Sequence, residues 1–208
     1  MKKRVTVPSA CALALALGAG SAFSGDPPPE GIEIKYLENV GSACPSDSVS
    51  AVLEHGEDGS TVRVTLPAAA VSLGPGVPLI ESRKNCQVAV GLHAPARFSF
   101  AVEAVDYSGA AELAPSVQGL HRVSYYFAGV WSPFVPYEVI RGPFSARWDT
   151  HRQIAEDEIV YVPCVNDITM NLSALWRLQP PPGQRPASSL SIDPGLLVRL
   201  RWRQCPPQ

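Results

Sequence analysis

The placement of five cysteines relative to an apolar N-terminal segment constrains this chain more than any other feature. Cys11 lies within that segment, whereas Cys44, Cys86, Cys164 and Cys205 lie after it. An even set of cysteines behind an export leader is typical of a small secreted domain held by disulfides. The sequence therefore predicts an exported domain with two disulfide bonds.

The leader has the layout of a signal peptide, which we assign to residues 1–24. Three basic residues open it, and residues 5–19 are mostly Ala, Leu and Val. A charged start, an apolar stretch and small residues before the cleavage point define such a peptide. The apolar stretch is shorter than the roughly 20 residues that span a bilayer. We therefore expect secretion to the extracellular space or the periplasm, and no membrane span in the mature chain.

The mature chain that this cleavage leaves is acidic. The full sequence has 17 basic and 19 acidic side chains, and the leader takes three basic ones, leaving 14 against 19. An acidic protein has no general electrostatic attraction to nucleic acid or anionic membranes. No nucleic-acid partner is expected. The composition leaves the oligomeric state open.

The length of the mature chain, residues 25–208, suits one domain with a sizeable core. A proline-rich stretch at 179–189 is interpreted as a surface loop within that domain, because Cys205 beyond it needs a partner upstream. Four cysteines allow three pairings. We predict the sequential one, Cys44–Cys86 and Cys164–Cys205, which ties each terminal region to an interior strand.

The hydrophobic pattern has the period of β-strands. Apolar and polar residues alternate through 97–107, 170–178 and 197–205, as they do in half-buried strands. Similar short runs occur at 32–40, 60–66, 86–93, 120–128, 137–147 and 158–163. Strands separated by Gly and Pro turns predict an antiparallel β-sandwich with almost no helix, apart from one turn within 149–158. The predicted core includes Phe98, Phe100, Trp176, Leu200 and Trp202.

A series of short motifs carries a family resemblance. In order, they are GSACP (41–45), LGPG (73–76), SRKNCQ (82–87), VDYSG (105–109), YYFAG (125–129), PC (163–164) and LRWRQC (200–205). The series resembles a family of small secreted proteins catalogued as domain of unknown function 4360. The resemblance covers nearly the whole mature chain and implies a secreted, disulfide-bonded, β-rich domain with cysteines in the same four places. It implies no activity, and nothing transfers onto the loop at 131–137.

Titratable residues supply no recognisable catalytic or metal-binding spacing. The four histidines stand alone, so neither a metal nor another cofactor is predicted. Glu103, Asp106 and Glu112 are candidates for a carboxylate pair, which glycoside hydrolysis needs at a separation of about 5–10 Å. The polar run 82–85 before Cys86 suits either an anion or sugar site or the support of loop backbone groups, and we favour the latter.

Aromatic residues are the best functional lead. Residues 125–127 are consecutive aromatics, so at least one must face away from the core of a one-sided strand. Further aromatics follow in a proline-containing loop. Exposed aromatic faces stack on sugar rings and anchor protein contacts. The alternative is that both sheet faces are covered here and the rings form a small satellite core. The candidate ligand-binding residues are Tyr125, Tyr126, Trp131, Phe134 and Tyr137.

Three classes of function remain open. We favour an exported, non-catalytic module that binds a glycan or an extracellular protein. The alternatives are a hydrolase acting on extracellular polymer and a structural component of an envelope or matrix. No catalytic residue is assigned, because no local spacing brings an acid, base or nucleophile within reach of a partner.

Overall fold

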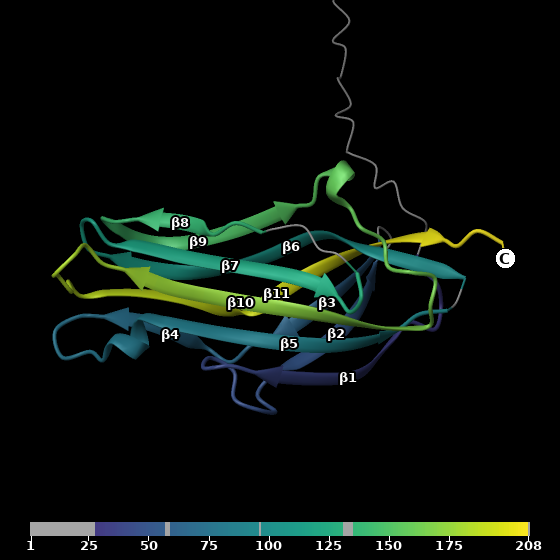
Figure 1. Ribbon diagram of the computed structural model, residues 1–208, viewed down its shortest axis with the longest axis horizontal. Helices are drawn as coiled ribbons and strands as arrows, with labels where there is room; N and C mark the ends of the chain where they lie inside the picture. The colour runs from purple at the N-terminus through teal and green to yellow at the C-terminus, as the bar shows by residue number, and fades with distance from the viewer. Residues whose placement is uncertain (1–27, 57–58, 96, 131–134, 208) are drawn as a thin grey trace, which may run out of the picture.

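A computed structural model describes residues 28–56, 59–95, 97–130 and 135–207. They form two antiparallel sheets, one in front of the other in Figure 1. In spatial order, the five-stranded sheet contains β1 (Glu33–Val40), β5 (Arg83–His93), β10 (Asp167–Gln179), β7 (Gln118–Phe127) and β8 (Glu138–Arg141). The six-stranded sheet contains β2 (Ser50–Gly56), β3 (Gly59–Thr65), β11 (Ser188–Gln204), β6 (Phe98–Leu113) and β9 (Phe144–Gln153), with β4 (Ala69–Leu73) paired to β11. The predicted antiparallel β-sandwich is confirmed. The predicted signal peptide lies outside the described residues.

Helical structure in the described chain is confined to two short 3-10 turns, η1 (Leu79–Ser82) and η2 (Glu156–Glu158). The turn η2 confirms the helical turn expected within 149–158. No helix in the described ranges has the length and apolar character that a membrane crossing needs.

Two predicted strands differ from the structure. The run 137–147 is two strands, β8 and β9, because the chain turns at Gly142–Pro143 and the two halves pair with different sheets. The run 158–163 forms no strand. Among the described residues, the segment 154–163 bonds to the backbone of β6 only through the N–H groups of Ile154 and Val162, at 2.8 and 2.9 Å. The intervening residues bend outward through η2, so no continuous ladder forms.

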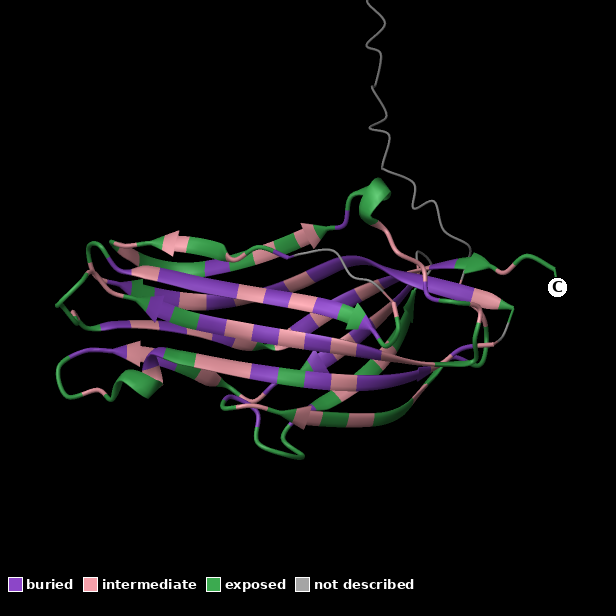
Figure 2. Ribbon diagram, viewed as in Figure 1, coloured by how far each residue is buried: buried purple, intermediate pink, exposed green. Residues whose placement is uncertain are grey.

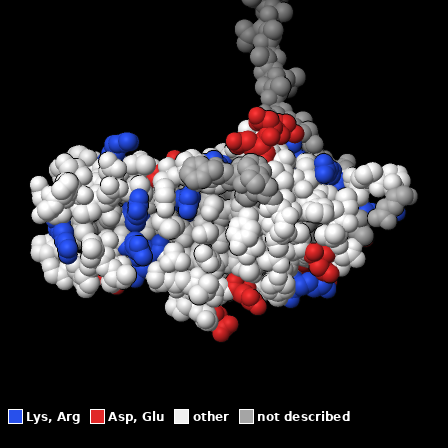
Figure 3. All heavy atoms as spheres, in the orientation of Figure 1, with Lys and Arg blue, Asp and Glu red and all other residues white. Residues whose placement is uncertain are grey.

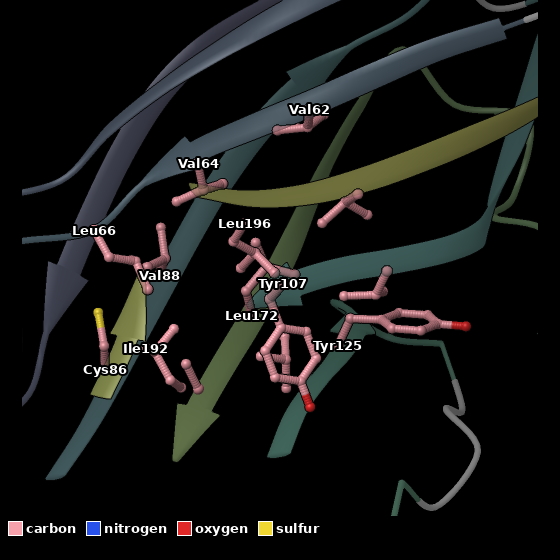
Figure 4. Close-up of a cluster of buried hydrophobic side chains, with 14 of the residues drawn as sticks. Val62, Val64, Leu66, Cys86, Val88, Tyr107, Tyr125, Leu172, Ile192 and Leu196 are labelled. Atoms are coloured by element: carbon pink, nitrogen blue, oxygen red, sulfur yellow. The ribbon is translucent and has the colours of Figure 1, made fainter. Parts of the chain in front are cut away.

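The core lies between the two sheets. Phe100, Trp176, Leu200 and Trp202 are each 1% exposed, and the rings of Phe100 and Trp202 have centroids 4.9 Å apart. These four predicted core residues are confirmed. Phe98 is only half-buried, because it is the first residue of β6, opposite the exposed Gln204 at the end of β11. Figure 4 shows part of this core, including side chains from both sheets.

Strand β6 is buried on both faces near its start, against the expectation of a solvated side. Ser99, Ala101 and Glu103 are at most 4% exposed. The segment after β9 covers them: Ser99 donates a hydrogen bond of 2.6 Å to the carbonyl of Val162, and the N–H of Ile154 donates one to the carbonyl of Glu103. In the same segment, Tyr161 stacks under Arg203, with the guanidinium carbon 3.9 Å from the ring centroid. The predicted exposure of this side of β6 is therefore wrong. The segment that buries it is irregular, so its sequence has no periodic pattern from which the contact could be predicted.

Both disulfides form as predicted. Cys44–Cys86 links the loop after β1 to β5, and Cys164–Cys205 links the segment before β10 to the end of β11. The sulfur–sulfur distances are 2.02 and 2.00 Å. The first bridge is buried and the second is partly exposed. Each bridge therefore joins a terminal region to the sandwich.

The outer face of the five-stranded sheet is formed by alternate residues of its strands. Along β10, the buried residues Leu172, Ala174 and Trp176 alternate with more exposed ones, as Figure 2 shows. The predicted alternation in 170–178 is thus confirmed. This outer face carries the candidate site.

Candidate functional site

Tyr36 lies on the outer face of the five-stranded sheet because of a β-bulge. The register of β1 on β5 shifts between Ile34 and Tyr36. A bulge inserts one extra residue and reverses the side to which the following side chain points. Ile34 is opposite the buried Leu92, whereas Tyr36 is opposite Gly91 and is 45% exposed.

The ring of Tyr36 lies across Gly91. A Cβ atom on Gly91 would lie 2.1 Å from Cε1 and 2.3 Å from Cδ1 of Tyr36, so no other residue leaves room for the ring. Beyond Gly91, the hydroxyl of Tyr36 forms a hydrogen bond with Oγ1 of Thr169 on β10. Glycine inside a strand is unfavourable by about 0.5–1 kcal/mol relative to alanine. Here it allows an aromatic ring to span three strands along the sheet surface.

Tyr126 is the second exposed ring on this face. It is 50% exposed and lies on β7 opposite Asn171 of β10. It lines a shallow hollow of about 270 Å³. A neighbouring hollow of about 540 Å³ is lined by Tyr36, Gly91 and Thr169. The two hollows have no lining residue in common, and the strands that carry the two tyrosines are three strand spacings, or about 14 Å, apart across the sheet.

The two hollows are lined by small and uncharged polar residues, together with the charged Lys35, Glu38 and Asp167 and the exposed Val40. Within the described chain, the side-chain amides of Gln87 and Asn171 make no hydrogen bond to protein, so they are open to a ligand. Figure 3 shows this face, on which most atoms belong to uncharged residues. We call the surface the tyrosine face; its residues are Tyr36, Gln87, Ala89, Gly91, Tyr126, Thr169, Asn171 and Ser173.

The candidate ligand-binding aromatics other than Tyr126 are not part of the tyrosine face. Tyr125 is 5% exposed and belongs to the core, as Figure 4 shows, so its ring is absent from the surface. Burial raises the pKa of its hydroxyl to about 12. Tyr137 is half-buried beside Arg122, whose guanidinium carbon is 4.6 Å from the ring centroid. Trp131 and Phe134 lie outside the described residues.

A cluster of titratable groups lies on the outer face of the six-stranded sheet. Asp106 is directly opposite His151 in the β6–β9 register, and their side chains form a hydrogen bond. Nη2 of Arg199 is 3.2 Å from Oδ2 of Asp106. The cluster borders a shallow hollow of about 240 Å³ that Asp149 also lines. Residues far apart in sequence meet here through strand pairing, which no local spacing could indicate.

Glu103 has a structural environment. Its carboxylate accepts hydrogen bonds from Nε and Nη2 of Arg201 at 3.1 and 2.7 Å, and Nη1 of Arg201 bonds to Glu156. The side chains of Glu103 and Arg201 are 5% and 9% exposed. This triad fastens η2 to the six-stranded sheet. Glu103 and Asp106 are thus each paired with an arginine, and Glu112 is exposed and makes no ion pair within the described residues.

His121 is buried between the sheets. Its ring stacks on Trp148 with centroids 4.0 Å apart, and its Nδ1 is 3.2 Å from the hydroxyl of Tyr107. Burial lowers the pKa of His121 to about 4. The ring is therefore a neutral part of the core at neutral pH.

The other histidines and the run 82–85 have ordinary partners. Nδ1 of His93 is 2.7 Å from Asp167, and Nδ1 of His55 is 3.1 Å from Ser60. Among the described residues, no group of three or more His, Cys, Asp or Glu side chains could hold a metal ion. Ser82 donates a hydrogen bond of 2.7 Å to the carbonyl of Leu79, which fits the predicted support of loop backbone groups.

Comparison with known proteins identifies the family. The model of a family described as domain of unknown function (DUF4360) matches residues 30–205. The chain belongs to the DUF4360 family. The resemblance found in the sequence motifs is therefore confirmed.

Two individual proteins are similar to this DUF4360 chain. An uncharacterized secreted protein of Arthroderma benhamiae is 30% identical over 194 residues, which cover 90% of this chain and 76% of the relative. The solved structure of TmCBM61 in complex with beta-1,4-galactotriose matches over 80% of this chain and 90% of that one, with 12% identity and a TM-score of 0.25. A TM-score this low establishes no common fold.

Proposed function

We propose that this protein is an exported, non-catalytic module that binds a glycan on the tyrosine face. The observation that carries the proposal is the ring of Tyr36, which crosses Gly91 and bonds to Thr169. Export is supported by the leader, by the two disulfides and by the secreted relative.

The chemistry of the face favours a sugar over a protein partner. Protein interfaces are anchored by a buried apolar centre that excludes water. Here the central strands β5 and β10 contribute Ala, Gly, Ser, Thr and amide side chains, and Tyr36 and Tyr126 are the exposed rings. A sugar ring offers an apolar C–H face to an aromatic ring and hydroxyl groups at its edge. The rings of Tyr36 and Tyr126 can stack on the C–H face of a sugar. The side-chain amides of Gln87 and Asn171 can form hydrogen bonds with its hydroxyl groups.

The ring of Tyr36 is also held in place before a ligand arrives. The hydroxyl of Tyr36 is bound to Thr169, and the ring has one side against the backbone of Gly91. Ordering a side chain on binding costs about 0.5–1.5 kcal/mol. A ring that is already positioned avoids most of that cost, which supports recognition at a shallow surface.

The experiment is a polysaccharide binding screen with the purified mature protein, followed by titration calorimetry on each ligand found. Tyr36→Ala and Tyr126→Ala should each weaken binding by about tenfold or more, with little change in Tm. Tyr161→Ala, in the irregular segment that packs on the opposite sheet, is the matched control and should leave the affinity unchanged. Equal affinities for all four proteins would disprove the proposal, and release of reducing ends from the ligand would favour the hydrolase instead.

A further inference from the structure

Three arginines gather at one end of the tyrosine face. Arg83 on β5 is directly opposite Arg177 on β10, and Arg122 on β7 is opposite Leu175, two residues before Arg177. Figure 3 shows blue atoms of basic residues on this face toward the end of β10. Both Arg83 and Arg177 are exposed, and Arg122 is half-buried.

Tyr137 organises two of these arginines. The guanidinium carbons of Arg122 and Arg177 lie 4.6 and 5.3 Å from the centroid of its ring. Such contacts orient the planar guanidinium groups while leaving their N–H donors available. We call Arg83, Arg122, Arg177 and Tyr137 the arginine cluster.

The positive charge of the arginine cluster is not balanced within the described chain. None of its arginines forms an ion pair there, and the nearby acids Glu81 and Glu138 pair with Lys84 and Arg152 at 2.8 and 3.9 Å. Like charges placed directly opposite on paired strands are destabilising. The sheet therefore maintains an unfavourable arrangement that an anion would relieve.

Arg122 adds a second sign of an incomplete site. Its Nε is buried and has no hydrogen-bond partner among the described residues. Its Nη1 makes a long bond of 3.4 Å to the carbonyl of Val135. A buried donor left without a partner is costly, and an acceptor supplied by a ligand would satisfy it.

We propose that the arginine cluster binds the carboxylate of an acidic sugar, so that the ligand of the tyrosine face is a uronate-containing polysaccharide. This inference rests on the proposed function. Guanidinium groups bind carboxylates through paired hydrogen bonds of fixed geometry. Arg177 is four residues beyond Ser173 on the same face of β10, about 13 Å along the strand. The ligand is therefore an extended chain whose acidic unit lies beyond the units stacked on the tyrosines.

The experiment compares each acidic polysaccharide with its uncharged form. Polygalacturonate, alginate and hyaluronan, each before and after chemical reduction of its carboxyl groups, are titrated against the mature protein at low and moderate salt. At least one native polymer should bind tenfold or more tightly than its reduced form, and its affinity should fall with added salt. Arg177→Ala and Arg83→Ala should remove this preference and leave the affinity for the reduced form unchanged. Arg147→Ala, an exposed arginine of the opposite sheet, is the control for lost charge.

The outcomes separate the two proposals. Binding that requires Tyr36 but is insensitive to carboxyl reduction would overturn the acidic-sugar inference and leave the glycan proposal standing. A preference for the native polymers that survives in Arg177→Ala and Arg83→Ala would overturn the assignment to the arginine cluster. Absence of binding to every polysaccharide, neutral or acidic, would overturn both.

Discussion

Tyr36 occupies the space that a Cβ atom on Gly91 would need, with Cε1 of the ring only 2.1 Å from the Cβ position. The two residues lie on neighbouring strands, β1 and β5, and are direct partners in the register. Glycine is thus needed at position 91 because of the space that it leaves for the Tyr36 ring, and not because of its backbone conformation. It gives the ring a place against the sheet, from which the hydroxyl reaches Thr169.

Replacing Gly91 by alanine should therefore impair binding without removing any ligand-contacting group. The added methyl group displaces the ring of Tyr36, and we expect glycan affinity to fall by about tenfold, which corresponds to about 1.4 kcal/mol. Calorimetry with the ligand identified in the screen measures this. Gly195→Ala, where a Cβ would meet nothing within 4 Å, is the matched control. An unchanged affinity of Gly91→Ala would show that the ring position is not important.

The two disulfides should differ in their contribution to stability. They join residues separated by 42 and 41 positions, so chain entropy predicts about 4 kcal/mol for each. Cys44 and Cys86 are 0% and 1% exposed, whereas the other pair is partly exposed. Replacing Cys44 and Cys86 by alanine should also leave a gap in the core and cost about 1–2 kcal/mol more. Urea unfolding of the two double variants tests this, and equal losses would contradict it.

His121 should make the protein less stable in mild acid. Its pKa is about 4 in the fold and about 6.5 in an unfolded chain. The unfolded state therefore binds more protons below pH 6.5, and the stability present above that pH is lost as the pH falls toward 4. Between pH 7 and pH 5 the loss from this group is about 2 kcal/mol. In His121→Gln, the free energy of unfolding should fall by about 2 kcal/mol less over this interval. Parallel pH profiles for the two proteins would exclude this role.

In the triad of Glu103, Arg201 and Glu156, substitution of the two glutamates should reduce the stability of the fold by very different amounts. The Glu103 side chain is 5% exposed and that of Glu156 is 77% exposed. Glu103→Gln leaves Arg201 without its buried partner and should cost about 3 kcal/mol or more. Glu156→Gln removes a solvent-screened pair and should cost less than about 1 kcal/mol. Chemical denaturation provides both values, and similar losses would mean that burial does not set the strength of these pairs.

Sequence patterns predicted the proposed site only in part. At least one of the consecutive aromatics 125–127 was expected to face away from the core, without an indication of which, and Tyr126 is the exposed one. Tyr36 was missed, because strict alternation from Ile34 would direct it inward, and only the bulge turns it outward. The single glycine opposite it carries no signal in sequence, since a glycine in a strand can have many causes.

Strand period, turn residues and cysteine count are local properties of the chain. They were sufficient to predict the sandwich, most strands and both disulfides, because alternation reports which side of a strand is buried. The tyrosine face and the arginine cluster are properties of strand register instead. Each combines side chains from strands distant in sequence, and a shift of one residue in pairing would send every one of them to the opposite side. Only the tertiary structure, which selects that register by packing the core, decides that these side chains meet.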